Sequence, residues 1–259
     1  MTPLEEKQIV LNKLLINYYV LENPKAETSF VFLHGWRSEA KVWLPIINSL
    51  VSEKIKIYAL DLPGFGKSEM PPKTFTLADY AETIAQFIET LKLKNACLVG
   101  HSFGGRVAIK LAATRPDLIQ KLFLANSAGI RRLSVKRGFS RAGAKIVKPI
   151  FKLPPLQPLR EKIYRRIGAE DYLVAGKMKE TFLKTINEDL TPFLPEIKQK
   201  TVIIWGDKDQ ETPFKDGELM AKEIPHAKLE IIKGAGHYSF IDKPDRFIQV
   251  LKEFLNEPA

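Results

Sequence analysis

Residues 98–105 are Leu98-Val99-Gly100-His101-Ser102-Phe103-Gly104-Gly105, and they contain the pattern G-x-S-x-G around a serine. A short apolar run precedes the pattern at residues 95–99, and a run with helical spacing follows it at residues 106–113. A serine on a tight turn between a strand and a helix is open to a substrate, and glycines beside it keep side chains out of the crowded turn. The N-terminus of the helix favours negative charge that develops there. The stretch therefore predicts a nucleophile elbow with Ser102 as the nucleophile.

A serine nucleophile needs a general base, and the chain has four histidines. His237 lies in the glycine-rich stretch Gly234-Ala235-Gly236-His237-Tyr238, which follows a strand-like apolar run. His226 follows a proline in a polar turn, as surface residues do. His101 lies inside the elbow, where we expect it to pack beside the serine, and His34 is expected to hold its own loop by hydrogen bonds. We therefore predict that His237 is the base.

The base needs a carboxylate that holds its tautomer and stabilises its protonated form. Two aspartates, Asp207 and Asp209, follow the strand-like residues 201–205 and precede His237. The order Ser102, Asp209, His237 on alternating strands and helices resembles the α/β-hydrolase fold superfamily, in its branch of cap-bearing serine esterases and meta-cleavage C–C hydrolases. That branch shows G-x-x-D-x-x-x-P after this strand, which implies that Asp209 is the acid. Asp207 is then expected to bond backbone amides of nearby residues.

A tetrahedral intermediate needs two hydrogen-bond donors aimed at its oxyanion. One is expected to be the backbone N–H of Phe103, the residue after the nucleophile. The strand-like residues 29–33 are followed by His34-Gly35-Trp36, which resembles the His-Gly-x loop of the family. The resemblance implies that the backbone N–H of Trp36 is the second donor and that the Trp36 ring lines the acyl pocket. The alternative for the ring is packing in the core.

Two other loops are not expected to supply the acid or to bind a nucleotide. Some relatives carry the acid one strand earlier, but here residues 121–125 are followed by Asn126-Ser127-Ala128-Gly129, which contains no carboxylate. Residues 61–68 contain a Pro-Gly turn, which Asp61 is expected to anchor. Their glycines do not match the spacing of a phosphate-binding loop, so nucleotide binding is not expected.

Length and composition bound the class of protein. The chain has 259 residues, of which 45% are hydrophobic, and this suits one α/β domain with a smaller insertion. The single cysteine, Cys97, cannot form an internal disulfide, and its apolar surroundings predict a buried thiol. The first residues lack the pattern of a secretory signal, and no apolar stretch has membrane-spanning length. A cytoplasmic location is therefore expected, with removal of a native signal peptide as the alternative.

Alternating runs predict the fold. Residues 8–21 alternate as a strand pair with a turn at Asn12-Lys13, and later strand-like and helical runs favour a mostly parallel sheet covered by helices. The resemblance implies an α/β-hydrolase fold with an eight-stranded sheet, whose core is residues 1–129 and 199–259. Strand-like runs are absent from residues 130–198, where prolines interrupt a helical composition. We expect a helical cap inserted there.

Three helix starts have capping residues. Thr76 and Asp79 form a capping box before a helical run that ends near Leu93. Thr212, directly before Pro213, is expected to cap a later helix. Asp242 is expected to precede the final helix in the same way.

The positive charge of the chain is concentrated in the expected cap. Residues 131–166 carry twelve Lys and Arg residues against Glu161 alone, a net charge of +11, whereas the whole chain carries +10. A solvated basic face, attraction of an anionic substrate, and peripheral contact with an anionic membrane surface all fit this charge. No nucleic-acid-binding motif accompanies it, so specific binding of nucleic acid is not expected.

Together these residues predict a serine hydrolase that cleaves a small carboxylic ester through an acyl-enzyme, without a metal or organic cofactor. The alternative enzyme is a meta-cleavage C–C bond hydrolase, whose dienoic acid substrate an arginine of the cap could bind. A third hypothesis is a hydrolase-fold receptor that binds a ligand with little turnover. Ser102 argues against the dehalogenases and epoxide hydrolases of the superfamily, which carry an aspartate at the elbow.

Overall fold

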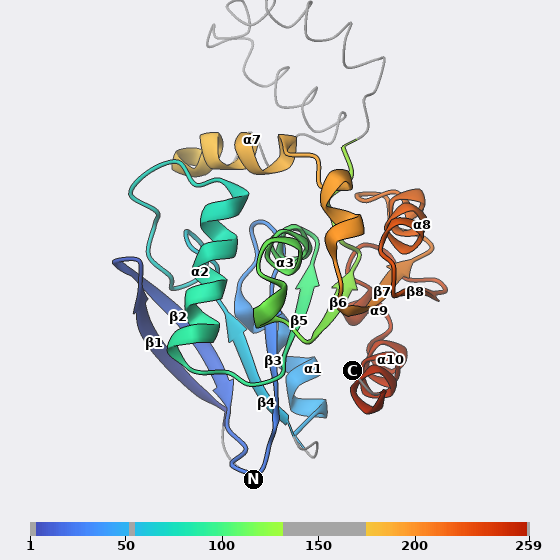
Figure 1. Cartoon of the computed structure of the whole chain (residues 1–259), viewed down its shortest axis with the longest axis horizontal. Helices are drawn as coiled ribbons and strands as arrows, with labels where there is room; N and C mark the ends of the chain where they lie inside the picture. The colour runs from blue at the N-terminus through green and yellow to red at the C-terminus, as the bar shows by residue number, and fades with distance from the viewer. Residues whose placement is uncertain (1–3, 52–54, 132–174, 258–259) are drawn as a thin grey trace, which may run out of the picture.

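Strands and helices alternate along most of the chain, and the strands assemble into one sheet of order β1-β2-β4-β3-β5-β6-β7-β8 (Figure 1). The computed structural model describes residues 4–51, 55–131 and 175–257. The strands are β1 (Glu5–Leu11), β2 (Leu14–Leu21), β3 (Thr28–Leu33), β4 (Ile55–Leu60), β5 (Ala96–His101), β6 (Lys121–Ala125), β7 (Lys200–Gly206) and β8 (Ala227–Ile232). The β1–β2 and β2–β4 pairs are antiparallel and all other pairs are parallel. The predicted mostly parallel, eight-stranded sheet is confirmed.

The hairpin of β1 and β2 forms where the sequence predicts it. The two strands pair up to Leu11 and Leu14, so only Asn12 and Lys13 lie in the loop. Both loop residues have positive φ, 50° and 65°, which a two-residue hairpin turn requires and which asparagine tolerates well. The turn therefore sets the register of the first strand pair.

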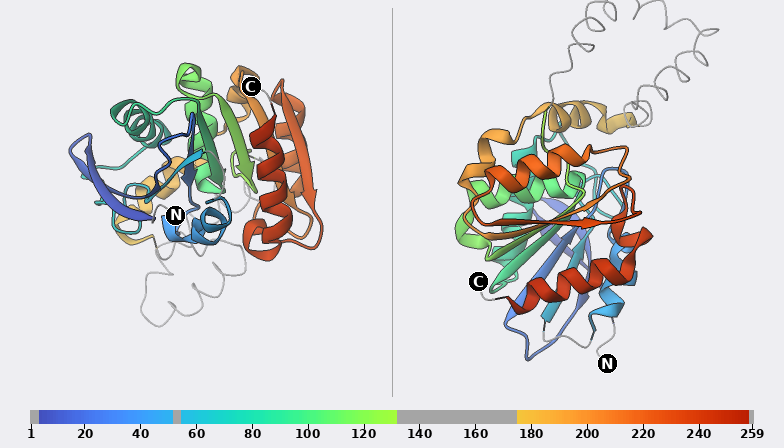
Figure 2. Two further views of the ribbon diagram at one scale, coloured as in Figure 1. Left: turned by 90° about the horizontal axis from the view of Figure 1, so that it is seen from below. Right: turned by 90° about the vertical axis from the view of Figure 1, so that its right-hand side faces the viewer.

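Helices cover both faces of the sheet (Figure 2). The α-helices are α1 (Leu44–Ser49), α2 (Leu77–Thr90), α3 (Phe103–Thr114), α7 (Lys179–Asn187), α8 (Phe214–Glu223), α9 (Ser239–Asp242) and α10 (Pro244–Asn256), and the short 3-10 helices are η1 (Ala40–Trp43), η2 (Pro116–Leu118), η5 (Gly176–Met178) and η6 (Thr191–Glu196). One apolar cluster joins α2, α3, α8 and η6 to one face of the sheet. A second cluster joins η1, α1, α9 and α10 to the other face.

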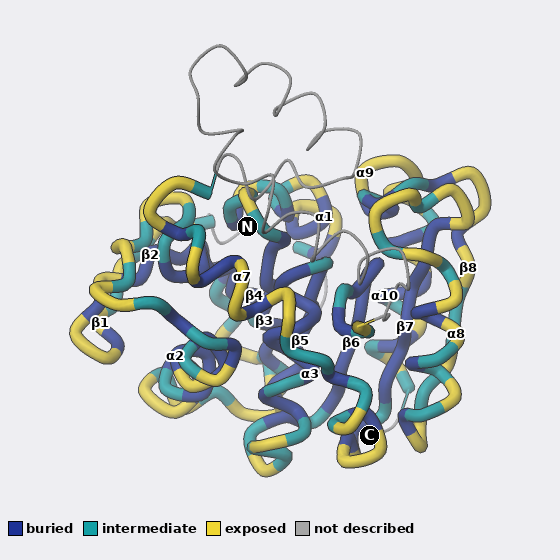
Figure 3. Tube along the Cα trace, turned by 90° about the horizontal axis from the view of Figure 1, so that it is seen from above, coloured by how far each residue is buried: buried dark blue, intermediate teal, exposed yellow. Residues whose placement is uncertain are grey.

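The amino-acid pattern of each layer explains its place. All six residues of β5 are buried, as expected for a parallel strand covered by helices on both faces (Figure 3). In α10 the buried residues are Phe247, Val250, Leu251 and Phe254, which recur with helical spacing and form one apolar stripe. The core forms where the apolar stripes of helices pack against the buried strands of the sheet.

The predicted helix starts are partly confirmed. Thr76 and Asp79 form the capping box of α2, which ends at Thr90 and not near Leu93. The prediction for Thr212 is wrong, because α8 begins at Phe214 after Pro213 and the Thr212 hydroxyl donates to a carboxylate of its own loop instead. The prediction for Asp242 is also wrong.

Asp242 is the last residue of α9, and α10 begins at Pro244 after Lys243. Its carboxylate accepts a hydrogen bond from the backbone N–H of Gly236 over 2.7 Å. The short helix α9 thus separates Asp242 from the start of α10 by Lys243.

The expected cap is described only in part. Residues 132–174, with all of the basic cluster except Arg131, lie outside the described residues. The described part, residues 175–198, contains η5, α7 and η6 and no strand. Hydrogen bonds from Phe75 N–H to the Thr181 hydroxyl (3.0 Å) and from Leu190 N–H to the Gly129 carbonyl (3.0 Å) join this part to the core. None of the helices within the described ranges has both the length and the apolar character needed to cross a bilayer.

The sheet brings the loops of interest together. Because β3, β5, β6, β7 and β8 are parallel, their carboxyl ends lie at one edge, where ligands bind in open α/β sheets. The loop that follows each strand carries, in this order, Trp36, Ser102, Asn126, Asp209 and His237.

Candidate active site

Ser102 lies on a strained turn between β5 and α3. Its φ is 51° and its ψ is −110°, a backbone conformation that residues with a side chain rarely adopt. The turn is held by hydrogen bonds from Ser102 N–H to the Ala125 carbonyl (3.2 Å) and from Ala128 N–H to the Ser102 carbonyl (3.1 Å). Neighbouring strand ends therefore keep the serine in a conformation that the local sequence alone would not favour.

Two glycines of the elbow are required by close approach of the backbone. A Cβ on Gly104 would lie 2.3 Å from the Leu33 carbonyl oxygen, and a Cβ on Gly100 would lie 2.7 Å from the Gly104 carbonyl oxygen. The first turn of α3 thus packs directly on the end of β3. This contact places the start of the helix beside the loop that carries Trp36.

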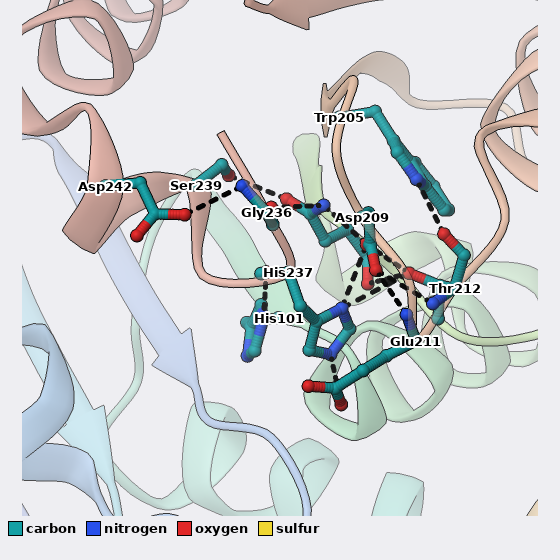
Figure 4. Close-up of polar contacts among 10 residues, drawn as sticks. His101, Trp205, Asp209, Glu211, Thr212, Gly236, His237, Ser239 and Asp242 are labelled. Carbon is teal, nitrogen blue, oxygen red and sulfur yellow. Dashed lines mark hydrogen bonds and ion pairs between the residues drawn. The ribbon is translucent and has the colours of Figure 1, made fainter. Parts of the chain in front are cut away.

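His237 and Asp209 form a buried pair. Nδ1 of His237 lies 2.9 Å from Oδ2 of Asp209, and the two side chains are 5% and 0% exposed (Figure 4). His237 is held by the loop between β8 and α9, and Asp209 by the loop between β7 and α8. The neighbouring parallel strands thus bring an imidazole and a carboxylate into hydrogen-bonding contact.

Several donors surround the Asp209 carboxylate. Oδ1 accepts hydrogen bonds from the backbone N–H groups of Glu211 (2.8 Å) and Thr212 (2.9 Å). Oδ2 accepts from the Thr212 hydroxyl (2.6 Å) and from Nδ2 of Asn126 (2.7 Å), in addition to His237. Burial raises the pKa of this carboxyl, but the hydrogen bonds from His237 and Thr212 outweigh burial and lower the pKa to about 2. Asp209 is therefore ionised at neutral pH.

The other ring nitrogen of His237 lies near a second carboxylate. Nε2 is 3.5 Å from Oε2 of Glu211, whose side chain is 64% exposed (Figure 4). Within the described part of the chain, the structure gives no hydrogen bond between the Ser102 hydroxyl and His237. Hydrogen bonds between a nucleophile and its base are often long in unliganded enzymes and shorten in the complex with substrate. The structure thus brings the predicted acid and base together, while the predicted nucleophile is not yet connected to them.

His101 supports the loop of His237. Its ring is fully buried, and its Nε2 lies 2.9 Å from the His237 carbonyl oxygen, so Nε2 carries the hydrogen of this bond. Burial and the nearby His237 lower the pKa of His101 to about 3, so the ring is neutral at physiological pH. The expectation that His101 packs beside the serine without acting as base agrees with this geometry.

The loop after β3 is anchored as predicted. Nε2 of His34 accepts the backbone N–H of Leu62 over 3.0 Å, and Nδ1 lies 2.7 Å from the Gly35 carbonyl. Burial lowers the pKa of His34 to about 4, so this ring is also neutral at physiological pH. Asp61 accepts the backbone N–H groups of Ala40 (2.7 Å) and Lys67 (2.9 Å), which confirms that it anchors its turn.

Aromatic rings line the elbow beside Trp36. The Trp36 ring is 4.8 Å from Phe65, 5.1 Å from Phe103 and 5.0 Å from Phe182, measured between ring centroids. Phe182 belongs to α7, so the described part of the expected cap covers this ring. The indole Nε1 of Trp36 is buried without a hydrogen-bond partner among the residues described.

Asp207, Cys97 and His226 lie in the environments that the sequence predicts. Asp207 accepts the backbone N–H of Gly234 over 2.6 Å, as expected for the aspartate that is not paired with His237. Cys97 is fully buried, and His226 is exposed. No group of three or more His, Cys, Asp or Glu side chains in residues 4–51, 55–131 and 175–257 is arranged to hold a metal ion.

The sequence motifs do not predict the partners of the proposed acid and base, which are Asn126, Glu211 and Thr212. The position of Asn126 at the end of β6 could have placed it beside the loop after β7, because these strands are neighbours. The residue types of Asn126, Thr212 and Glu211 do not by themselves indicate contact with Asp209 or His237.

Comparisons with known proteins place most of the chain, from β3 to α10, in one family. A model of the alpha/beta hydrolase family matches residues 30–250. The uncharacterized hydrolase YugF of Bacillus subtilis is 27% identical over 272 aligned residues, which cover 96% of this chain and 97% of YugF. A 2-hydroxy-6-oxononadienedioate/2-hydroxy-6-oxononatrienedioate hydrolase of Pseudomonas is 24% identical and covers 87% of each chain.

A solved structure is similar over nearly the full length. The structure of a membrane phospholipase A, described as a bacterial virulence factor, superimposes with a TM-score of 0.77 at 25% identity. The superposition covers 98% of this chain and 86% of that chain. The similarity therefore extends over both the sheet and the helices that cover it.

Proposed function

We propose that this chain, which belongs to the alpha/beta hydrolase family, hydrolyses small carboxylic esters through an acyl-enzyme on Ser102. The observation that carries the proposal is the 2.9 Å contact between Nδ1 of His237 and the buried, ionised Asp209. A serine at a strained elbow, on the same edge of the sheet, supports it further. An activated serine needs such a base and carboxylate nearby.

The reaction proceeds in two steps. Oγ of Ser102 attacks the carbonyl carbon of the ester while its proton passes to Nε2 of His237. The tetrahedral intermediate collapses, and the leaving alcohol takes the proton from Nε2. A water molecule then gives a proton to Nε2 and attacks the acyl carbon. As the second tetrahedral intermediate collapses, Nε2 returns this proton to Oγ of Ser102 and the carboxylic acid is released. Asp209 stabilises the imidazolium that forms in each step.

The backbone N–H groups of Trp36 and Phe103 are proposed to bind the oxyanion. Phe103 is the first residue of α3, so its N–H has no acceptor within the helix. Trp36 lies in the loop after β3, on which the first turn of α3 packs. Two donors preorganised in this way stabilise the charge that develops on the carbonyl oxygen. The aromatic rings around Trp36 are suited to an apolar acyl group.

Two hypotheses compete with ester hydrolysis: cleavage of a C–C bond, and binding of a ligand with little turnover. Similarity to the Pseudomonas hydrolase favours cleavage of a C–C bond in a 2-hydroxy-6-oxo dienoic acid. Similarity to the phospholipase A favours esters, because phospholipases A cleave carboxylic esters. A receptor that binds its ligand with little turnover would keep the same site geometry.

Hydrolysis of p-nitrophenyl acetate, butyrate, octanoate and laurate tests the proposal. We expect Ser102-dependent turnover that falls by about 10³-fold or more in both Ser102→Ala and His237→Ala. His226→Ala, which alters an exposed histidine, is the matched control and should retain wild-type rates. Ester hydrolysis that persists in Ser102→Ala would contradict the proposal. Turnover of a dienoic acid without ester hydrolysis would favour the C–C hydrolase, and ligand binding without turnover would favour the receptor.

A further inference from the structure

Asn126 contacts both the predicted acid and the loop of the predicted base. The residue follows β6 and is fully buried. Its Nδ2 donates to Oδ2 of Asp209 over 2.7 Å and to the Gly236 carbonyl over 3.3 Å. Its Oδ1 accepts the Ser239 hydroxyl over 2.6 Å. The amide of Asn126 therefore joins the loop after β7, which carries Asp209, to the chain after β8, which carries Gly236 and Ser239.

The Asp209 carboxylate and the Gly236 carbonyl fix which way the amide points, because both can only accept hydrogen bonds. If the amide were turned around, its oxygen would face the Asp209 carboxylate, and two acceptors would meet without a hydrogen between them. The hydroxyl of Ser239, also fully buried, completes the acceptor side of the amide in the observed orientation. The donor side therefore remains directed at the acid.

The backbone of Asn126 is fixed as well. Its N–H donates to the Ile204 carbonyl of β7 over 2.8 Å. Its φ is 45°, in the left-handed region, which asparagine tolerates better than most residues. Neighbouring strands thus set the position from which the amide reaches Asp209.

We propose that Asn126 is a positioning residue of the reaction, which holds the Asp209 carboxylate turned toward Nδ1 of His237 and ties it to the loop of the base. The inference rests on the proposed function of Ser102, Asp209 and His237. Without the amide, the carboxylate loses one of the donors on the oxygen that faces His237, and the imidazole is held less firmly. The amide bonds only to groups of the protein, so its loss affects the proton transfers and not the binding of substrate. The effect therefore falls on kcat and leaves KM unchanged.

Asn126→Gly is the most direct test, because glycine adopts a φ of 45° without strain and removes only the side chain. Asn95→Gly is the matched control, since Asn95 has a φ of 47° but is exposed and lies before β5. We expect kcat for the ester to fall about 10- to 100-fold in Asn126→Gly, the range for losing one hydrogen bond to a charged group. KM should stay within about twofold in both variants, and Asn95→Gly should keep the wild-type kcat.

Ser239→Ala is a milder second variant, because it removes only the hydrogen-bond donor to the amide oxygen of Asn126. A several-fold fall in kcat at unchanged KM is expected. A folded Asn126→Gly protein with wild-type kcat would overturn the proposal. If Asn126→Gly does not fold, a wild-type kcat in Ser239→Ala overturns it instead.

A spectroscopic measurement separates this inference from the proposed function. The proton shared between His237 Nδ1 and Asp209 should give a low-field proton resonance in wild type and in Asn95→Gly. The resonance should weaken or move upfield in Asn126→Gly, and an unchanged resonance would count against positioning by Asn126. Ester hydrolysis that survives Ser102→Ala would contradict the proposed function alone, since the resonance does not depend on turnover.

Discussion

His237 presents its Nδ1 to Oδ2 of Asp209 over 2.9 Å, with the carboxylate fully buried. A carboxylate can only accept a hydrogen bond, so the proton of this contact lies on Nδ1. Nε2 is then unprotonated in the neutral ring and can accept a proton from a nucleophile. The contact thus sets the tautomer that base catalysis requires.

Asp209→Asn should abolish most activity without unfolding the protein. An amide at this position can donate to Nδ1, which favours the tautomer with the proton on Nε2, and it no longer balances the charge of an imidazolium. We expect kcat to fall on the order of 10³- to 10⁴-fold. Rates with a p-nitrophenyl ester check this expectation.

Asp207→Asn is the matched control for that variant. Asp207 lies two residues away in the same loop, where it accepts the backbone N–H of Gly234 and lies 3.9 Å from Nζ of Lys208. Its replacement should change kcat by less than about threefold. A large loss in Asp207→Asn with little loss in Asp209→Asn would reverse the assignment of the acid.

Ser102→Gly should be more stable than Ser102→Ala, although both are inactive. Alanine keeps the Cβ that strains the turn at a φ of 51°, whereas glycine adopts this conformation freely. The relief of strain is offset in part by the entropy of glycine, so we expect a gain of about 1 kcal/mol in the free energy of unfolding. Urea denaturation of the two variants measures it, and a Ser102→Gly protein that is less stable than Ser102→Ala would show that the elbow stores no strain.

The stability that Asp209 contributes should be lost in acid. Its pKa is about 2 in the folded protein against 3.8 ordinarily, so the unfolded chain binds the proton first as the pH falls. The contribution is complete above about pH 5 and disappears toward pH 2, with a total of about 2 kcal/mol. The neutral histidines His34 and His101 also affect acid stability, but they are common to wild type and Asp209→Asn.

Comparison of wild type with Asp209→Asn therefore isolates the contribution of the Asp209 carboxylate to stability. The difference in their free energy of unfolding, measured by urea titration from about pH 7 downward, should narrow below about pH 5. A difference that stays constant with pH would mean that the ionised carboxylate does not stabilise the fold.

Much of the fold could be predicted from the sequence because local patterns determine it, whereas the pairing of Asp209 with His237 was implied by the resemblance to the family. The elbow around Ser102 depends on glycines at fixed spacing, and the hairpin at Asn12-Lys13 depends on residues that tolerate positive φ. The capping box at Thr76 involves residues only three apart. Each of these features is set by a short stretch of chain.

Contacts between distant loops could not be predicted in this way. Thr212 has the residue type of a helix cap, but the nearby Asp209 carboxylate competes for its hydroxyl. Asn126 and Ser239 lie 113 positions apart, and the pairing of β6 with β7 and of β7 with β8 brings them together. The contacts around Asp209 therefore depend on how the strands pair in the sheet and not on any sequence motif.

Covalent trapping of Ser102 tests the central claim most directly. Wild-type protein is treated with a p-nitrophenyl phosphonate ester and digested, and the peptides are analysed by mass spectrometry, with His237→Ala treated in parallel. The account predicts a single phosphonyl adduct on the peptide that carries Ser102, formed much more slowly in His237→Ala. An adduct on another residue, or no adduct in a protein that still hydrolyses esters, would contradict it.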